Sequence, residues 1–153
     1  MPGLEDLYRE IILDHYKSPR NRGELATPPA VSAQGHNPLC GDEITVYLQL
    51  DGDTVTDIKV GGSGCSISQS SASMMSQAVK GKSVDDVKAI VRRFKGMMSI
   101  DTEDDSPLPD VKLGDLEALQ GVVKFPVRIK CATLAWNTLT EALAEALAEA
   151  GQS

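Results

Sequence analysis

The sequence predicts an α+β fold in which helices pack on one face of an antiparallel three-stranded sheet. Two observations support this prediction. Alternating apolar residues run through residues 31–60, whereas apolar residues spaced by three or four positions follow Cys65. Strands followed by helices in this order are typical of α+β domains. The length of 153 residues fits one domain over residues 1–153, large enough to form a core without disulfides.

An amphipathic helix is predicted first, over residues 4–16. Its apolar residues share one stripe at helical spacing, and they are Leu4, Leu7, Tyr8, Ile11 and Ile12. Pro19 ends the helix, because proline disfavours the helical conformation in the residue before it. His15 continues the apolar stripe, so we expect it to be a partly buried core histidine.

Three strands are predicted next, beginning with a short one at residues 31–36. The second shows the two-residue period of a half-buried strand, with apolar Ile44, Val46, Leu48 and Leu50. Asp51-Gly52 predicts a tight hairpin, and residues 54–60 form the returning strand. Val55 is out of phase with that strand, which indicates a β-bulge.

Helices are predicted in the second half of the chain. The glycine-rich segment 61–64 is interpreted as a loop leading to Cys65, where a helix begins that contributes Met74 and Met75 to the core. Ser83 and Asp86 resemble a capping box for a helix that runs to Gly96. Residues 97–121 are expected to form a loop with one helical turn near Leu116. Cys131 is expected to open the last helix, with Trp136 on its apolar face.

Charge and composition exclude several classes of protein. The net charge of −7 is opposite in sign to that of a phosphate-binding surface, so nucleic acid is not an expected partner. No run of 18 apolar residues exists, and Glu5 and Asp6 near the start are unlike a secretory signal. We therefore expect no membrane contact and a cytoplasmic location, where widely spaced cysteines are metal ligands or reactive thiols more often than disulfides.

The three cysteines each lie at the boundary of a predicted element. Cys40 precedes the second strand, while Cys65 and Cys131 are expected at helix starts, where the helix dipole favours the thiolate form. An isolated free cysteine is commonly a small buried apolar residue. Three at glycine- or proline-flanked boundaries favour a shared metal site instead, although separations of 25 and 66 residues match no short zinc-finger pattern.

The fourth ligand has two candidates. Asp42 follows Cys40 by two residues, and Gly41 between them leaves the backbone free to turn both side chains inward. Zinc accepts carboxylate oxygen as well as thiolate and imidazole. His36, four residues before Cys40, is the alternative. An aspartate beside glycine is more commonly a surface turn residue, and a lone histidine is usually structural.

Three ordered motifs give the cysteines a specific context. They are residues 37–42 (NPLCGD), 64–68 (GCSIS) and 126–132 (PVRIKCA). Together with residues 14–21 (DHYKSPRN), they resemble the U-type iron–sulfur assembly proteins over essentially the whole chain. Members of the IscU type carry a histidine where this chain has Lys130, and they lack the extra segment within residues 97–121. Both differences favour the SufU branch.

The resemblance implies a single site formed by Cys40, Asp42, Cys65 and Cys131 that holds Zn²⁺ tightly. It implies that Cys40 accepts sulfur from a SufS-type cysteine desulfurase, and that downstream cluster-assembly proteins receive it. The chain would then be a sulfurtransferase-like partner and activator of the desulfurase. Arg128 is a candidate for stabilising an anionic thiolate or persulfide at this site.

Two other functions use the same ligands. An iron–sulfur scaffold would hold a transient, nascent cluster, with Asp42 as a labile oxygen ligand, because thiolates bind such clusters as well as zinc. A binding module would hold a purely structural zinc. A measurement of metal content would distinguish the scaffold from the two zinc proteins, and a measurement of persulfide transfer would distinguish the sulfur acceptor from the structural zinc protein.

Overall fold

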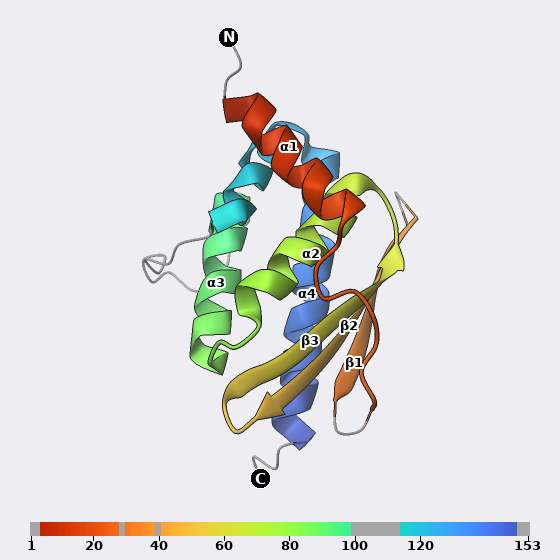
Figure 1. Cartoon of the computed structure of the whole chain (residues 1–153), viewed down its shortest axis with the longest axis vertical. Coiled ribbons are helices and arrows are strands. Elements are labelled where there is room, and N and C mark those ends of the chain that lie inside the picture. The colour runs from red at the N-terminus through yellow and green to blue at the C-terminus, as the bar shows by residue number, and fades with distance from the viewer. Residues whose placement is uncertain (1–3, 28–29, 39–40, 99–113, 150–153) are drawn as a thin grey trace.

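The computed structural model describes residues 4–27, 30–38, 41–98 and 114–149 (Figure 1). Helix α1 is followed by three strands and then by the remaining helices. The first elements are α1 (Leu4–Lys17), β1 (Val31–Asn37), β2 (Asp42–Asp51) and β3 (Thr54–Ser63). The later elements are α2 (Ser66–Val79), α3 (Val84–Met97), the 3-10 helix η1 (Gly114–Lys124) and α4 (Pro126–Glu149). The predicted helix and strand types agree with these elements.

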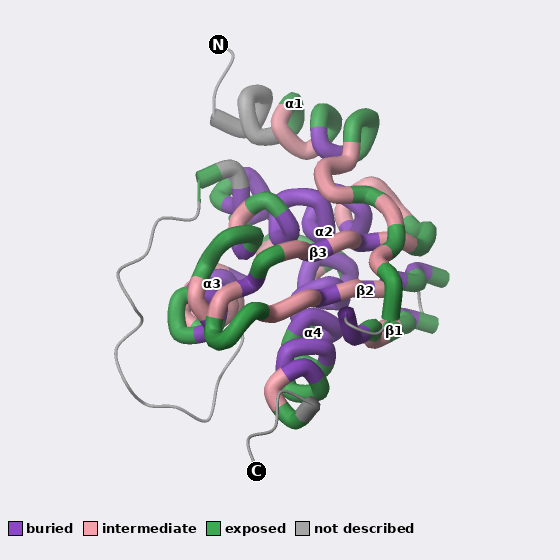
Figure 2. Tube along the Cα trace, turned by 60° about the horizontal axis from the view of Figure 1, so that its bottom comes forward, coloured by how far each residue is buried: buried purple, intermediate pink, exposed green. Residues whose placement is uncertain are grey.

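The sheet is antiparallel with strand order β1-β2-β3, and helices cover one of its faces. Helix α4 packs on β1 and β2, and α2 packs on β3 and α4. Figure 2 shows the buried residues concentrated along α2 and α4, between the sheet and the outer helices. The predicted α+β fold is therefore confirmed. Among the described residues, no helix is both long and apolar enough to span a bilayer.

A β-bulge in the β2–β3 hairpin explains the phase of Val55. Gln49 pairs with Asp57, but the next residue, Leu50, pairs with Val55, so β3 has one extra residue at this point. Val55 and Ile58 are both fully buried despite their odd spacing. The predicted bulge is confirmed, and it keeps both apolar side chains on the core face.

Strand β3 extends further than the sequence predicts. Gly61 and Gly62 were expected in a loop, but they pair with Thr45 and Ile44 of β2. The ladder of hydrogen bonds with β2 outweighs the weak strand preference of glycine. A Cβ on Gly62 would collide with the carbonyl of Glu43, so the strands approach too closely for a side chain here.

The last helix begins earlier than predicted, at Pro126 instead of Cys131. Proline is favoured in the first turn of a helix, because its missing N–H would have no partner there. Within the predicted loop 97–121, the described part from Gly114 onward is the 3-10 helix η1 instead of a single turn. Residues 99–113 lie outside the described residues.

Buried serines of α2 connect it to its neighbouring helices. Ser71 Oγ donates to the carbonyl of Ala132 (2.5 Å) and accepts from Nε1 of Trp136 (2.9 Å). Ser73 Oγ lies 2.8 Å from Nδ1 of His15, which is fully buried instead of partly buried as predicted. Met74, Met75 and Trp136 are buried core residues, as predicted, and Trp136 stacks on Phe94. These contacts hold α1 and α4 against α2.

Candidate metal centre

Three potential ligands converge where the sheet meets two helices. Asp42 is the first residue of β2, Cys65 directly precedes α2, and Cys131 lies in the second turn of α4. One carboxylate oxygen of Asp42 and the two sulfur atoms all lie within 4.8 Å of one another. Asp42 and Cys131 are fully buried, whereas Cys65 is partly exposed. The cluster is therefore reachable from solvent on the Cys65 side.

The carboxylate of Asp42 is held by the backbone at the start of α2. Its Oδ1 accepts a hydrogen bond from the N–H of Cys65 (2.8 Å), and its Oδ2 lies 3.8 Å from Cys65 Sγ. Cys65 occupies the N-cap position of α2, but its side chain makes no capping hydrogen bond. The thiol therefore faces the carboxylate, at a helix end whose dipole favours negative charge.

Gly64 allows this close approach. A Cβ built on Gly64 would collide with Oδ1 of Asp42 and with the hydroxyl of Ser68. Any larger residue would push the carboxylate away from Cys65 or displace the start of α2. The glycine before Cys65 is thus required by the space that Asp42 occupies.

Cys131 sits deeper in the molecule than a helix-opening residue would. Its Sγ lies 4.0 Å from the carbonyl oxygen of Val127, one turn earlier in α4, and 4.0 Å from Nδ2 of Asn37. Asn37 is the last residue of β1 and is buried. Its position beside Cys131 was not predicted, although Asn37 belongs to the same NPLCGD segment as Cys40.

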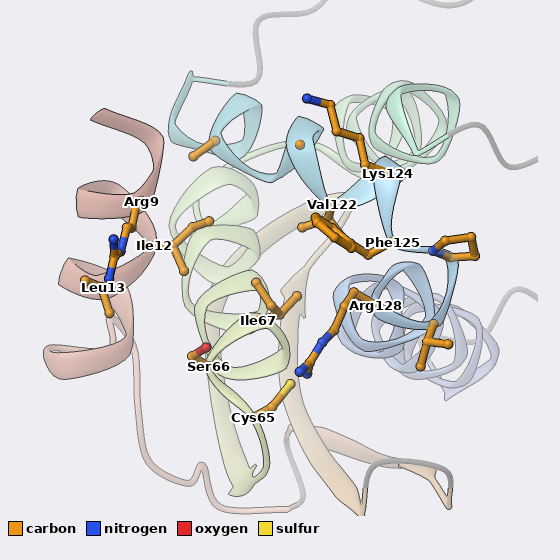
Figure 3. A pocket seen from close by; sticks show the side chains of 14 residues that line it. Arg9, Ile12, Leu13, Cys65, Ser66, Ile67, Val122, Lys124, Phe125 and Arg128 are labelled. Atoms are coloured by element: carbon orange, nitrogen blue, oxygen red, sulfur yellow. The ribbon is translucent and has the colours of Figure 1, made fainter. Parts of the chain in front are cut away.

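Arg128 reaches the two cysteines from the first turn of α4. Figure 3 shows its guanidinium next to the sulfur of Cys65. The negative charge of a Cys65 thiolate and a hydrogen bond to Cys131 raise the pKa of the Arg128 guanidinium above its usual range. Arg128 and Cys131 are three residues apart on one helix, which places both side chains on the same face. A permanent positive charge therefore lies beside the cluster.

Cys40 and His36 were also predicted as candidate ligands. Cys40 lies outside the described residues. Gly41 beside it has a φ of +70° and donates its N–H to the carbonyl of Asn37 (2.9 Å), so the chain does turn at this glycine. His36 is exposed on β1, paired with Glu43, and does not belong to the cluster that the described residues form. Since neighbouring strand residues face opposite sides, Asn37 points inward and His36 does not.

The three described donors fit a zinc ion. Zinc–sulfur bonds of about 2.3 Å in a tetrahedral site place two ligand sulfurs ~3.8 Å apart. Donors within 4.8 Å of one another reach that spacing with shifts of about 1 Å or less. A buried carboxylate beside two cysteines is costly to leave without a positive partner, and a bound cation would offset that cost.

Comparisons with known proteins identify the family and the fold. A family model described as the NifU-like N terminal domain matches residues 7–132. The zinc-dependent sulfurtransferase SufU of Bacillus subtilis (strain 168) is 51% identical over 142 residues, which cover 93% of this chain and 92% of that protein. The iron–sulfur cluster assembly scaffold protein IscU of Streptococcus pyogenes serotype M1 is 44% identical over 92% of this chain and 84% of that protein. The crystal structure of the N-terminal part of a nitrogen-fixing NifU-like protein from Brucella abortus matches with a TM-score of 0.77 and 26% identity, over 94% of this chain and 96% of that one.

Proposed function

Because this chain belongs to the NifU-like N-terminal domain family, we propose that it is a zinc-dependent sulfur acceptor that takes persulfide sulfur from a cysteine desulfurase for iron–sulfur cluster assembly. The family resemblance inferred from the motifs around Cys40, Cys65 and Cys131 is confirmed by the family match. Two of the relatives are named as a sulfurtransferase and as a cluster scaffold, and each name supports a candidate function.

The observation that carries the proposal is the convergence of Asp42, Cys65 and Cys131 within 4.8 Å. These three side chains would hold Zn²⁺, with Cys40 as the fourth ligand. Zinc would keep the cysteine sulfurs deprotonated without taking part in redox chemistry. A set of three sulfurs and one oxygen favours zinc over the hard cations Mg²⁺ and Ca²⁺.

Cys40 is the proposed acceptor, and Asp42, Cys65 and Cys131 remain as ligands. The Cys40 thiolate attacks the outer sulfur of the persulfide on the desulfurase cysteine. A bond forms between Cys40 Sγ and that outer sulfur, while the bond between the outer sulfur and the desulfurase cysteine breaks. The desulfurase cysteine leaves as a thiolate, so the exchange needs no external oxidant or reductant.

Arg128 contributes a fixed positive charge at this step. Its guanidinium lies beside Cys65 and Cys131, whose sulfurs would carry negative charge as metal ligands. A nearby cation stabilises thiolate and persulfide anions alike. Arginine suits this role because it stays protonated at every physiological pH.

The second candidate is a scaffold that assembles an iron–sulfur cluster on the same ligands. The 44% identity to a relative named as a scaffold supports it, since thiolates bind iron–sulfur clusters readily. Asp42 would then be the weaker ligand that permits release of the cluster.

One experiment tests both candidates. The full chain is purified without added metal, its zinc and iron are measured, and it is then incubated with the cysteine desulfurase of the same organism and free cysteine. We expect about one zinc per chain and a mass increase of one sulfur on Cys40, absent in Cys40→Ala. Brown protein that absorbs near 400 nm and forms no persulfide would support the scaffold and overturn the proposed sulfur acceptor. Sulfur added to Cys65 or Cys131 would show that the acceptor is wrong.

A further inference from the structure

A groove of about 1040 Å³ opens beside the candidate metal centre, between α1, α2, η1 and the start of α4 (Figure 3). Cys65 and Arg128 lie at one end of it. Apart from Cys65, none of the described residues that line the groove is a proposed metal ligand. Its volume is at the upper end of the range for small-molecule sites, which is large enough for several side chains of a protein segment.

The lining of the groove is mainly apolar and includes side chains that stay unusually exposed. Ile12 of α1 and Ile67 of α2 contribute to it. Leu13 is 36% exposed, while Phe125 and Val127 at the start of α4 are each 61% exposed. Large apolar side chains grouped at this exposure commonly mark a surface that another molecule covers.

Three cations border the same groove. Arg9 lies on α1, Lys124 at the end of η1 and Arg128 on α4, and all three are exposed. None of the described residues that line the groove carries a carboxylate. The whole chain has a net charge of −7, so this positive border is a local reversal of sign. A negatively charged partner would be repelled by most of this surface and attracted here, which would orient its approach.

We propose that the groove docks an apolar segment that carries carboxylates and belongs to the protein that donates sulfur. This inference rests on the proposed function and adds the chemistry of the contact. Apolar side chains of the segment would cover Phe125 and Val127, while a carboxylate of the segment would pair with Arg9. A second copy of this chain fits less well, because two chains of net charge −7 repel each other. Since Cys65 ends the groove, docking would bring the donor's persulfide to the metal centre.

The test uses four single variants of the full chain and the cysteine desulfurase of the same organism. Arg9→Glu and Phe125→Ser change the groove, and neither residue holds the metal or reacts. Lys88→Glu on α3 and Tyr16→Ser on α1 are matched controls, because Lys88 is exposed, Tyr16 is 45% exposed, and neither lines the groove. The dissociation constant is measured by titration calorimetry at low and high salt. Zinc content and melting temperature are measured for each variant.

We expect Arg9→Glu and Phe125→Ser to weaken desulfurase binding about tenfold or more, and the controls to change it less than about twofold. Arg9→Glu should also reduce the salt dependence of binding, whereas Phe125→Ser should preserve it. Zinc content and persulfide formation at saturating desulfurase should stay at the parent level in all four variants. A groove variant that loses zinc is replaced by Val127→Ser, for which the same loss of binding is expected.

Other outcomes overturn the docking proposal. If parent and groove variants bind the desulfurase equally while sulfur transfer proceeds, the groove proposal fails and the proposed function stands. If the desulfurase binds no parent protein and transfers no sulfur, both fail. Saturable binding of sodium palmitate that Phe125→Ser abolishes, with desulfurase binding unchanged, would show that the groove takes an amphiphile instead of a protein segment.

Discussion

Asp42 is fully buried, although a carboxylate loses favourable hydration when it leaves water. The N–H of Cys65 donates a hydrogen bond to one carboxylate oxygen of Asp42, and the other oxygen faces the Cys65 sulfur. Two thiolates and a carboxylate at such close range repel one another unless a cation lies between them. These three side chains therefore suit a bound cation, and Arg128 is an additional positive neighbour outside the cluster.

A matched pair of substitutions tests which residues are ligands. Cys131→Ser should lose most of the bound zinc, because a hydroxyl is a much poorer zinc ligand than a thiolate. His36→Ser should retain zinc at the parent level, since His36 is exposed and outside the cluster. Metal analysis of both proteins after gel filtration is the measurement. Full zinc occupancy in Cys131→Ser, or its loss in His36→Ser, would contradict the proposed ligand set.

Gly64 offers a test of the distance between Asp42 and Cys65. In Gly64→Ala, the new methyl group would collide with the Asp42 carboxylate, so we expect zinc affinity to fall at least about tenfold. Gly121→Ala is the control, because a Cβ on Gly121 would meet nothing within 4 Å. Competition with a chromophoric zinc chelator measures both affinities. Equal affinities would mean that zinc binding does not depend on the present position of the Asp42 carboxylate.

At the scale of elements, α2 is a buried helix whose polar residues serve as connections. Ser70 donates to the carbonyl of Ile12 on α1, and Ser71 bonds to both Ala132 and Trp136 on α4. Serine is an uncommon choice for a buried helix, but each of these hydroxyl groups has a partner. The helix that begins at Cys65 is therefore held on two sides, which restricts the position of the thiol relative to Cys131.

Ser71→Ala should destabilise the protein by about 1–3 kcal/mol, because Nε1 of Trp136 would lose its acceptor while remaining buried. Ser32→Ala on β1 is the control, since Ser32 is exposed and should change stability by less than about 0.5 kcal/mol. Urea denaturation of the zinc-loaded proteins, followed by tryptophan fluorescence, gives both values. An unchanged midpoint for Ser71→Ala would show that the Trp136 hydrogen bond contributes little.

For the whole molecule, a bound metal would join segments that are distant in the chain. The described donors come from β2, α2 and α4, which form three different parts of the fold. The unfolded chain does not bring these segments together, so a metal held here binds the native state and stabilises it by mass action.

Removing zinc with a chelator should therefore lower the melting temperature by about 10 °C, as expected for a stabilisation of about 4 kcal/mol in a chain of this size. Cys131→Ser, which should carry little zinc, is the control and should show almost no shift on chelation. Differential scanning calorimetry with and without EDTA measures both. A parent protein that melts at the same temperature in EDTA would contradict tight zinc binding.

Several features of this protein follow from the sequence alone. Apolar periodicity predicts the strands and helices, because the pattern depends only on which side of each element faces the core. The odd phase of Val55 predicts the bulge between β2 and β3. The boundary positions of the cysteines indicate a metal site, and the motifs around them identify the family.

Other features are decided only by tertiary packing. Asp42 and Cys65 are 23 residues apart in sequence, and local patterns carry no information on how such segments meet. Hydrogen bonding to β2 extends β3 through two glycines that weaken a strand by themselves. Alternation along β1 turns Asn37 towards Cys131 and leaves His36 exposed. The groove beside Cys65 likewise exists only because α1, η1 and α4 pack around the start of α2.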